Sequence, residues 1–205
     1  MRKINTLFFL GLVSLIFLIA CSKSASTPAP TLLQTALQIK VVDNLGNPVS
    51  GASVKLYSTQ TDLTNGTNQV GTTQLTNASG ITTFQPLIPG KFYWYANLDC
   101  KTNMFGSVTT TNDITANVTN SVTTVLASTS LITLKNNSAN PYSISLDGTI
   151  INASLAGNSS IDYKIPSGNH TIITTQLSGY LLVPTIKTYT INPTCGQVLT
   201  QAFPN

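Results

Sequence analysis

Ionisable side chains are scarce in this chain. Its 205 residues include no Glu, one Arg and one His, and charged residues make up 8% of the total. General acid–base catalysis and metal binding depend on His, Cys and carboxylate groups held close together. The six carboxylates are scattered along the sequence, at Asp43, Asp62, Asp99, Asp113, Asp147 and Asp162. We therefore expect no enzymatic activity, no catalytic residue, no metal site and no cofactor.

Positive charge is also sparse beyond the first few residues. Without Arg2 and Lys3 the chain carries eight Lys and six Asp, a net charge of +2. Proteins that bind nucleic acid gather Lys and Arg on one face. Nucleic acid is therefore not an expected partner.

The single histidine, His170, follows a turn-forming stretch and is expected on a surface strand.

One long apolar run occurs, and it lies at the start of the chain. Two cations precede residues 7–20, which are apolar apart from Gly11 and Ser14. As a helix this run would reach about 21 Å, which is short of a bilayer core of about 30 Å. The pattern predicts a secretory signal peptide over residues 1–20. An uncleaved membrane anchor is the alternative.

The end of this run carries a specific motif. Leu18-Ile19-Ala20-Cys21 resembles the bacterial lipobox. That resemblance implies cleavage before Cys21 and attachment of lipid to its thiol, which would anchor the chain to a membrane. Two or more acyl chains anchor a protein stably, whereas one does not.

The segment after the motif, residues 21–35, is rich in Ser, Thr and Pro and is expected to be a flexible tether. Residue 22 is Ser rather than the Asp associated with inner-membrane retention, which favours the outer membrane of the cell envelope. The sequence leaves open whether the protein faces the periplasm or the cell surface.

The remaining residues lack the strongest helix formers. Glu is missing and Ala is sparse, whereas Thr, Val and Ile, which suit pleated strands, are abundant. Alternating apolar residues predict strands over 37–42, 52–57, 70–75, 81–84, 91–97, 114–118 and 122–126, with a polar loop over 58–68. The predicted fold class is all-β, built as two small β-sandwich modules over 36–128 and 129–205.

A family resemblance covers the first module. The stretches 39–57 (IKVVDNLGNPVSGASVKLY), 76–84 (TNASGITTF) and 87–94 (LIPGKFYW) are similar to carboxypeptidase-regulatory-like and Cna-B-like domains. This resemblance implies a transthyretin-like or immunoglobulin-like sandwich that serves as a spacer or binding module. It also implies a non-catalytic role.

The second module shows a weaker resemblance. Strands are expected over 131–135, 142–146, 161–165, 170–176, 187–191 and 198–203, and Asp147-Gly148 predicts a tight hairpin turn. The stretches 145–148 (SLDG), 165–171 (IPSGNHT) and 178–180 (SGY) resemble the small β modules named after the PEGA motif, although that tetrapeptide is missing.

Two cysteines remain besides Cys21. Cys100 and Cys195 form an even pair, one in each module, in a chain that is expected to be exported. This favours a disulfide that would join the modules. Two free thiols in loops are the alternative.

The aromatic stretch at residues 92–95 offers a candidate ligand platform. Alternation along a strand places Phe92 and Trp94 on one face and Tyr93 and Tyr95 on the other. An exposed strip formed by Tyr93 and Tyr95, or by Trp94, could stack on a sugar ring or meet a partner protein. The alternative is that the tyrosines cover a neighbouring strand.

These observations favour a membrane-anchored, non-catalytic lipoprotein that acts as a structural or protein-interaction module. A carbohydrate-binding lipoprotein is the second hypothesis. The expected partners are the membrane, through lipid on Cys21, and envelope proteins or glycans.

Overall fold

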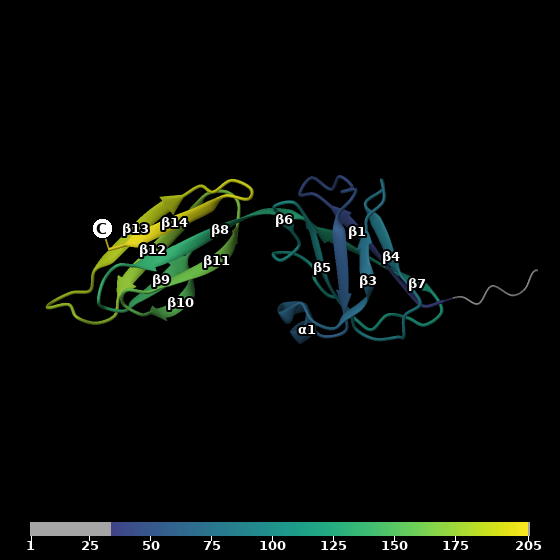
Figure 1. Ribbon diagram of the computed structural model, residues 1–205, viewed down its shortest axis with the longest axis horizontal. Coiled ribbons are helices and arrows are strands. Elements are labelled where there is room, and N and C mark those ends of the chain that lie inside the picture. The colour runs from purple at the N-terminus through teal and green to yellow at the C-terminus, as the bar shows by residue number, and fades with distance from the viewer. Residues whose placement is uncertain (1–33, 205) are drawn as a thin grey trace, which may run out of the picture. The chain divides into compact units, whose positions relative to one another are not determined.

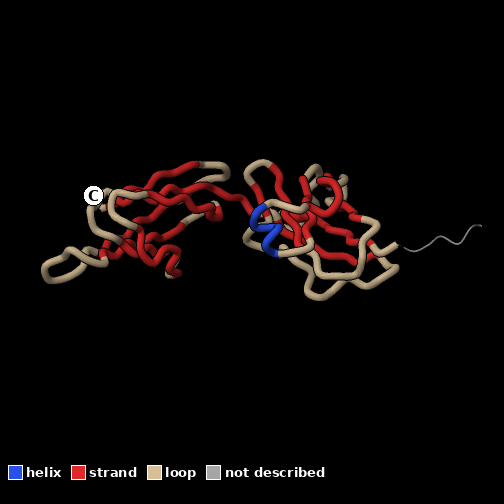
Figure 2. The backbone as a smooth tube through the Cα atoms, turned by 60° about the horizontal axis from the view of Figure 1, so that its bottom comes forward, coloured by secondary structure: helices blue, strands red, loops and turns tan. Residues whose placement is uncertain are grey.

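The computed structural model describes residues 34–204, which form an almost entirely β structure (Figures 1 and 2). Fourteen strands and one short helix follow one another along this part of the chain. The all-β class predicted from composition is therefore confirmed. Among the described residues, no helix is long and apolar enough to cross a membrane. The predicted signal peptide, Cys21 and nearly all of the predicted tether lie outside the described residues.

The first core lies between two layers of strands. One layer has the order β4 (Ile81–Phe84), β1 (Ala36–Val42), β7 (Thr119–Val125); the other contains β3 (Gln69–Leu75), β2 (Ser53–Tyr57), β5 (Tyr93–Leu98) and β6 (Lys101–Thr102). Alternate residues of each strand point inward, as the period-2 pattern predicts. The buried cluster includes Leu37, Ile39, Val54, Leu56 and Trp94.

The second core has the same construction. One layer has the order β10 (Thr149–Leu155), β9 (Tyr142–Leu146), β12 (His170–Gln176), β13 (Ile186–Ile191). In the other, β11 (Ser160–Pro166) and β14 (Val198–Phe203) flank β8 (Ala127–Asn136). The rings of Tyr142 and Phe203 meet edge to face at 5.4 Å between centroids. The hairpin predicted at Asp147-Gly148 is present, with positive φ values of 50° and 82°.

Strand β8 belongs to the layers of both cores. Its first residues, Ala127 and Ser128, pair with β6, whereas the residues from Thr129 onward pair with β11. The first core ends at Leu126 in sequence and the second begins at Ile132. The predicted boundary between residues 128 and 129 thus falls inside a continuous strand, and no linker separates the two cores.

Two local predictions were wrong. The predicted loop over 58–68 contains helix α1 (Gln60–Asn65), because Thr59 caps it by accepting a hydrogen bond from the Asp62 amide and Gly66 ends it in the left-handed conformation. The predicted strand over 114–118 is irregular. Asn117 has φ of 57°, and the Asn120 side chain bonds to the backbone of Thr115, so this segment has no ladder partner.

Two buried asparagines hold irregular backbone in place. Asn103 accepts a hydrogen bond from the Ala96 amide and donates to the carbonyl oxygens of Trp94 and Ser107. Asn136 donates to the carbonyl oxygens of Asn140, Leu155 and Ala156. Buried carbonyls left unpaired would cost about 1–3 kcal/mol each, so these two side chains fix the connections that they bridge.

Candidate functional site

The aromatic stretch on β5 divides between the core and the outer face of its sheet. Phe92 and Trp94 are buried, and Trp94 is only 1% exposed because it sits opposite Leu56 within the first core. Tyr93 and Tyr95 point outward and are half-buried. The prediction that Trp94 could belong to an exposed ligand platform was therefore wrong.

Tyr95 lies in a groove beside α1. We call this hollow the Tyr95 groove; it has a volume of about 490 Å³ and is lined by Lys55, Tyr57, Gln60, Leu63, Thr64, Asn65, Gly66, Tyr95, Met104 and Val108. Lys55 faces Tyr95 directly across the β2–β5 ladder. Burial, with a smaller contribution from neighbouring Tyr57, raises the pKa of the Tyr95 phenol. A tyrosine hydroxyl is protonated near neutral pH, so that of Tyr95 can donate a hydrogen bond.

Tyr93 lies outside the lining of this groove. Its strand partner is Tyr57, and the Lys91 ammonium lies 6.0 Å from the centre of its ring. That distance is at the outer limit of a cation–π contact. Tyr93 and Tyr95 therefore lie on the same face of the sheet, and Tyr95 alone of the two lines the Tyr95 groove.

The wall of the Tyr95 groove depends on two features that the sequence prediction missed. Helix α1 supplies Gln60, Leu63 and Thr64, but its segment was expected to be a loop. Met104 and Val108 come from the segment after β6, which the buried Asn103 ties to β5. The capping pattern from Thr59 to Gly66 was a signal that could have indicated the helix.

Cys100 and Cys195 are bonded to each other in the structure, with Cα atoms 5.6 Å apart and a sequence separation of 95. Cys100 lies in the turn between β5 and β6, and Cys195 precedes β14. Thr129 of β8 joins both: its amide and its hydroxyl donate to the Cys100 carbonyl, and its own carbonyl accepts from the Gly196 amide. The disulfide therefore closes the junction at which β8 passes from one core to the other.

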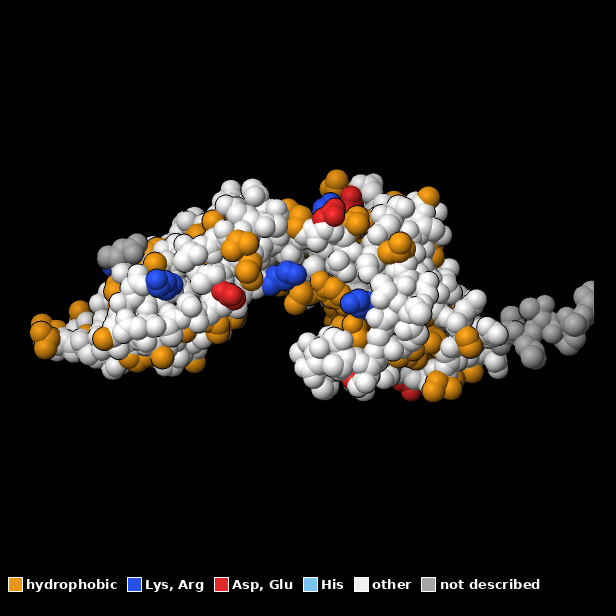
Figure 3. Space-filling view, viewed as in Figure 1, with side chains coloured by type: hydrophobic (Ala, Val, Ile, Leu, Met, Phe, Trp, Pro, Cys, Tyr) orange, Lys and Arg blue, Asp and Glu red, His pale blue; other side chains and the backbone are white. Residues whose placement is uncertain are grey.

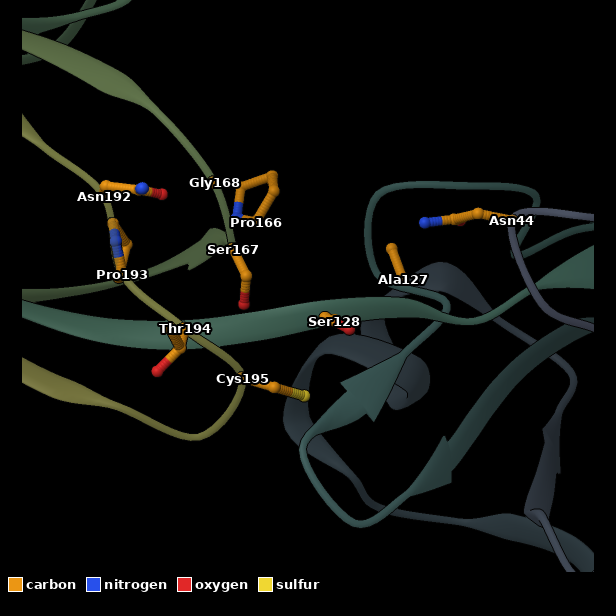
Figure 4. A pocket seen from close by; sticks show the side chains of 10 residues that line it. All are labelled: Asn44, Ala127, Ser128, Pro166, Ser167, Gly168, Asn192, Pro193, Thr194 and Cys195. Atoms are coloured by element: carbon orange, nitrogen blue, oxygen red, sulfur yellow. The ribbon is translucent and has the colours of Figure 1, made fainter.

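A second hollow lies beside this disulfide (Figure 4). Its volume is also about 490 Å³, and its lining residues are Asn44, Ala127, Ser128, Pro166, Ser167, Gly168, Asn192, Pro193, Thr194 and Cys195. None of these side chains ionises, because the sulfur of Cys195 is held in the disulfide. The surface can offer hydroxyl, amide and backbone groups to a neutral polar molecule, but it has no group suited to proton transfer.

His170 is 9% exposed, so the expectation of a surface histidine was wrong. Its Nδ1 lies 2.6 Å from Asp147 Oδ2, and its Nε2 lies 2.8 Å from the Pro166 carbonyl oxygen. Since both ring nitrogens face acceptors, a doubly protonated ring can donate to both and a neutral ring to only one. The Thr171 amide donates to Asp147 Oδ1. This cluster fastens the β9–β10 turn to the start of β12.

Within residues 34–204, no group of three His, Cys or carboxylate side chains is placed to hold a metal ion. The Asp43 carboxylate accepts hydrogen bonds from the backbone amides of Leu45 and Asn47 and from the Asn47 side chain. The Asn47 side chain contributes most to lowering the pKa of Asp43. These bonds stabilise the turn between β1 and β2.

The Asp147–His170 contact predicts a pH-dependent contribution to stability. The hydrogen bond from His170, followed by that from the Thr171 amide, lowers the pKa of Asp147 below 3.8. A carboxyl group with a lowered folded-state pKa stabilises the fold above its unfolded pKa, and this contribution is lost as pH falls through the folded value. Because Asp147 is half exposed, we expect Asp147→Asn to cost about 1 kcal/mol near neutral pH.

Urea denaturation at a series of pH values measures this effect. The difference between the native protein and Asp147→Asn should shrink as pH falls below about 4. Asp113→Asn, at an exposed aspartate, is the control and should change stability little at any pH. A difference that stays constant from neutral to acidic pH would contradict the assignment.

Comparisons with known proteins find similarity in three-dimensional structure but not in sequence. No protein-family model matches the chain, and no curated protein matches its sequence. A streptococcal ancillary pilin is 14% identical, with a TM-score of 0.39; the match covers 83% of this chain and 62% of that one.

Two further solved structures are similar at the same level. A minor pilin from Streptococcus agalactiae is 14% identical, with a TM-score of 0.30 and coverage of 83% of this chain and 94% of that one. A DUF3823 family protein from Bacteroides ovatus is 8% identical, with a TM-score of 0.32 and coverage of 78% and 98%. With identities this low and TM-scores below 0.5, the likenesses do not extend to function.

Proposed function

We propose that this protein is a membrane-anchored lipoprotein of the cell envelope that acts as a non-catalytic structural or protein-interaction module. One observation carries the proposal: the two β cores share strand β8, and a disulfide closes the point at which they meet. A spacer that holds a binding surface away from a membrane needs modules that do not swing freely on a flexible linker.

The bonding around the junction supports this role. Besides the β6–β8 pairing, the Ser167 amide donates to the Ser128 carbonyl and the Leu131 amide donates to the Gln197 carbonyl. A disulfide that closes a loop of this length stabilises a fold by about 4.7 kcal/mol in the chain-entropy account. The junction is thus held by backbone hydrogen bonds and by a covalent bond.

The disulfide also supports export. Disulfides persist in oxidising compartments and are rare in the cytosol. The signal-like residues 1–20 and the lipobox-like motif ending at Cys21 give the same indication independently. The resemblances of 36–128 to carboxypeptidase-regulatory-like domains and of 129–205 to PEGA-like modules agree with a spacer or binding role. Ser22 favours the outer membrane.

Lipid on Cys21 is the first point to test. In the bacterial host, the mature native protein should carry a lipid-sized mass increase and partition into detergent. Cys21→Ala should lose both, because no thiol remains to accept the diacylglyceryl group. Intact-mass measurement and detergent phase separation are the assays, and Ser24→Ala is a matched control that should behave as the native protein does. A native chain that retains residues 1–20 and carries no lipid would contradict the proposal.

Carbohydrate binding at the Tyr95 groove is the second candidate function. The specific observation is that an outward tyrosine lies among groups that suit a sugar: apolar Leu63 and Val108, the amides of Gln60 and Asn65, and the Lys55 ammonium. Aromatic rings and apolar side chains cover the C–H face of a sugar, while a few placed polar groups fix its orientation. Lys55 would favour an acidic sugar.

Affinity electrophoresis in gels containing xylan, β-glucan or polygalacturonate tests this candidate. We expect polygalacturonate to retard the native protein, and Tyr95→Ala to weaken that binding about tenfold, or ~1.4 kcal/mol. Tyr93→Ala, on the same sheet face but outside the groove, is the matched control and should bind normally. Migration unaffected by all three polysaccharides would reject the candidate, and equal losses from both variants would remove the groove as its site.

A further inference from the structure

The connection between β12 and β13 exposes a continuous run of apolar side chains. We call residues 177–185 the apolar loop. At its tip, Leu181 is 101% exposed, Leu182 92% and Val183 75%, and Tyr180 beside them is 44% exposed. Figure 3 shows orange side chains at the tip of this loop, which lies at the left of Figure 1. Soluble proteins expose such contiguous apolar surface mainly where it meets a partner or a membrane.

The base of the apolar loop is firmly attached to the second core. The Gln176 amide donates to the Thr185 carbonyl at 2.9 Å, and the Gln176 side chain donates to the Ser178 carbonyl at 2.8 Å. The Leu177 amide donates to the Pro141 carbonyl of the β8–β9 connection. These bonds leave the apolar side chains of residues 181–183 projecting from a fixed base.

Two lysines lie near the apolar loop. The loop itself contains no charged residue, and Lys187 follows it in β13. Lys135 is the next-to-last residue of β8, just before the 137–141 connection that the loop base contacts. Of the two aspartates of the second module, Asp147 is beside His170 at the start of β12, and Asp162 in β11 bonds to Thr133, two residues before Lys135.

We propose that the apolar loop inserts its tip into the interfacial region of a lipid bilayer that carries anionic headgroups. Leu and Val side chains enter the boundary of the acyl chains favourably. Tyr is enriched at the level of the headgroups, because its ring is apolar and its hydroxyl is polar. Exposed Lys187, which follows the loop in β13, would lie where anionic headgroups attract it. Protein-binding hot spots, in contrast, favour Trp, Tyr and Arg, and Leu and Val are under-represented there.

The inference does not require lipid on Cys21, because other residues make the contact. If Cys21 is lipidated, the anchor raises the effective concentration of the loop near a membrane, so that a weak insertion suffices. The two sites are therefore testable separately.

Vesicle co-sedimentation of an unlipidated form covering residues 32–205 tests the proposal, since both cores are built from residues 37–203. We expect this form to pellet with phosphatidylcholine–phosphatidylglycerol vesicles and more weakly with phosphatidylcholine alone. The double variant Leu181→Ser with Leu182→Ser should bind at least tenfold more weakly. The matched control combines Ile150→Ser with Val198→Ser. These apolar residues are also exposed but lie in strands β10 and β14, away from the loop sequence, so this variant should bind as the native form does.

Insertion itself can be followed by fluorescence. Leu182→Trp places an indole at the loop tip, whereas the chain's own tryptophan, Trp94, is buried in the first core. Lipids brominated on their acyl chains should quench the introduced tryptophan and leave Trp94 unaffected.

Three results would overturn the proposal: no pelleting of the native form with either vesicle, equal binding by the native form and the double variant, or no quenching at position 182. Absence of vesicle binding would point instead to a pocket in a partner protein. Since both leucines are almost fully exposed, the double variant should unfold at the same urea concentration as the native form. That check separates loss of binding from loss of fold, and the lipidation of Cys21 is measured independently.

Discussion

The backbone of β8 is the feature on which the rest of the structure depends. Each core alone is a small two-layer sandwich, and a chain segment between two such cores usually behaves as a hinge. Here the segment is a strand that pairs with β6 at Ala127 and Ser128 and with β11 and β14 beyond them. The disulfide between Cys100 and Cys195 holds the flanking turns against Thr129. The junction is thereby made from the same hydrogen bonds as the sheets.

Each core carries one surface of interest, although the chain has few charged groups. The Tyr95 groove lies on the first core, between α1 and the segment held by Asn103. The apolar loop extends from the second core, at the end of β12 away from the Asp147–His170 contact. Both surfaces are supported by buried polar side chains that satisfy backbone groups, which is how irregular segments remain ordered without ion pairs.

Much of the fold was predictable because most strands alternate. In β1, Leu37, Ile39 and Val41 point inward while Lys40 is exposed. Asp147-Gly148 marks the hairpin between β9 and β10. The errors arose where side chains bond to nearby backbone. Thr59 and Gly66 cap helix α1 within the segment that was expected to be a loop. The Asn120 side chain bonds to the backbone of Thr115, within the segment 114–118 that was expected to be a strand. Propensity alone does not report such local bonds.

The candidate sites were less predictable than the strands. Alternation correctly separated Phe92 and Trp94 from Tyr93 and Tyr95, but it could not tell which face was covered. The groove also requires α1, which lies outside any strand pattern. The pairing of His170 with Asp147 joins residues 23 positions apart, and sequence spacing does not reveal such a distance in space.

Native-state hydrogen exchange at the junction tests the central claim most directly. The amide of Thr129, bonded to the Cys100 carbonyl, and the amide of Gly196, bonded to the Thr129 carbonyl, report on the junction itself. If β8 is a continuous shared strand, both should exchange as slowly as the hydrogen-bonded amides inside the β8–β11 ladder. Exchange of Thr129 and Gly196 at the rate of an open chain, while the amides of β12 remain protected, would contradict the account and make residues 127–129 a hinge.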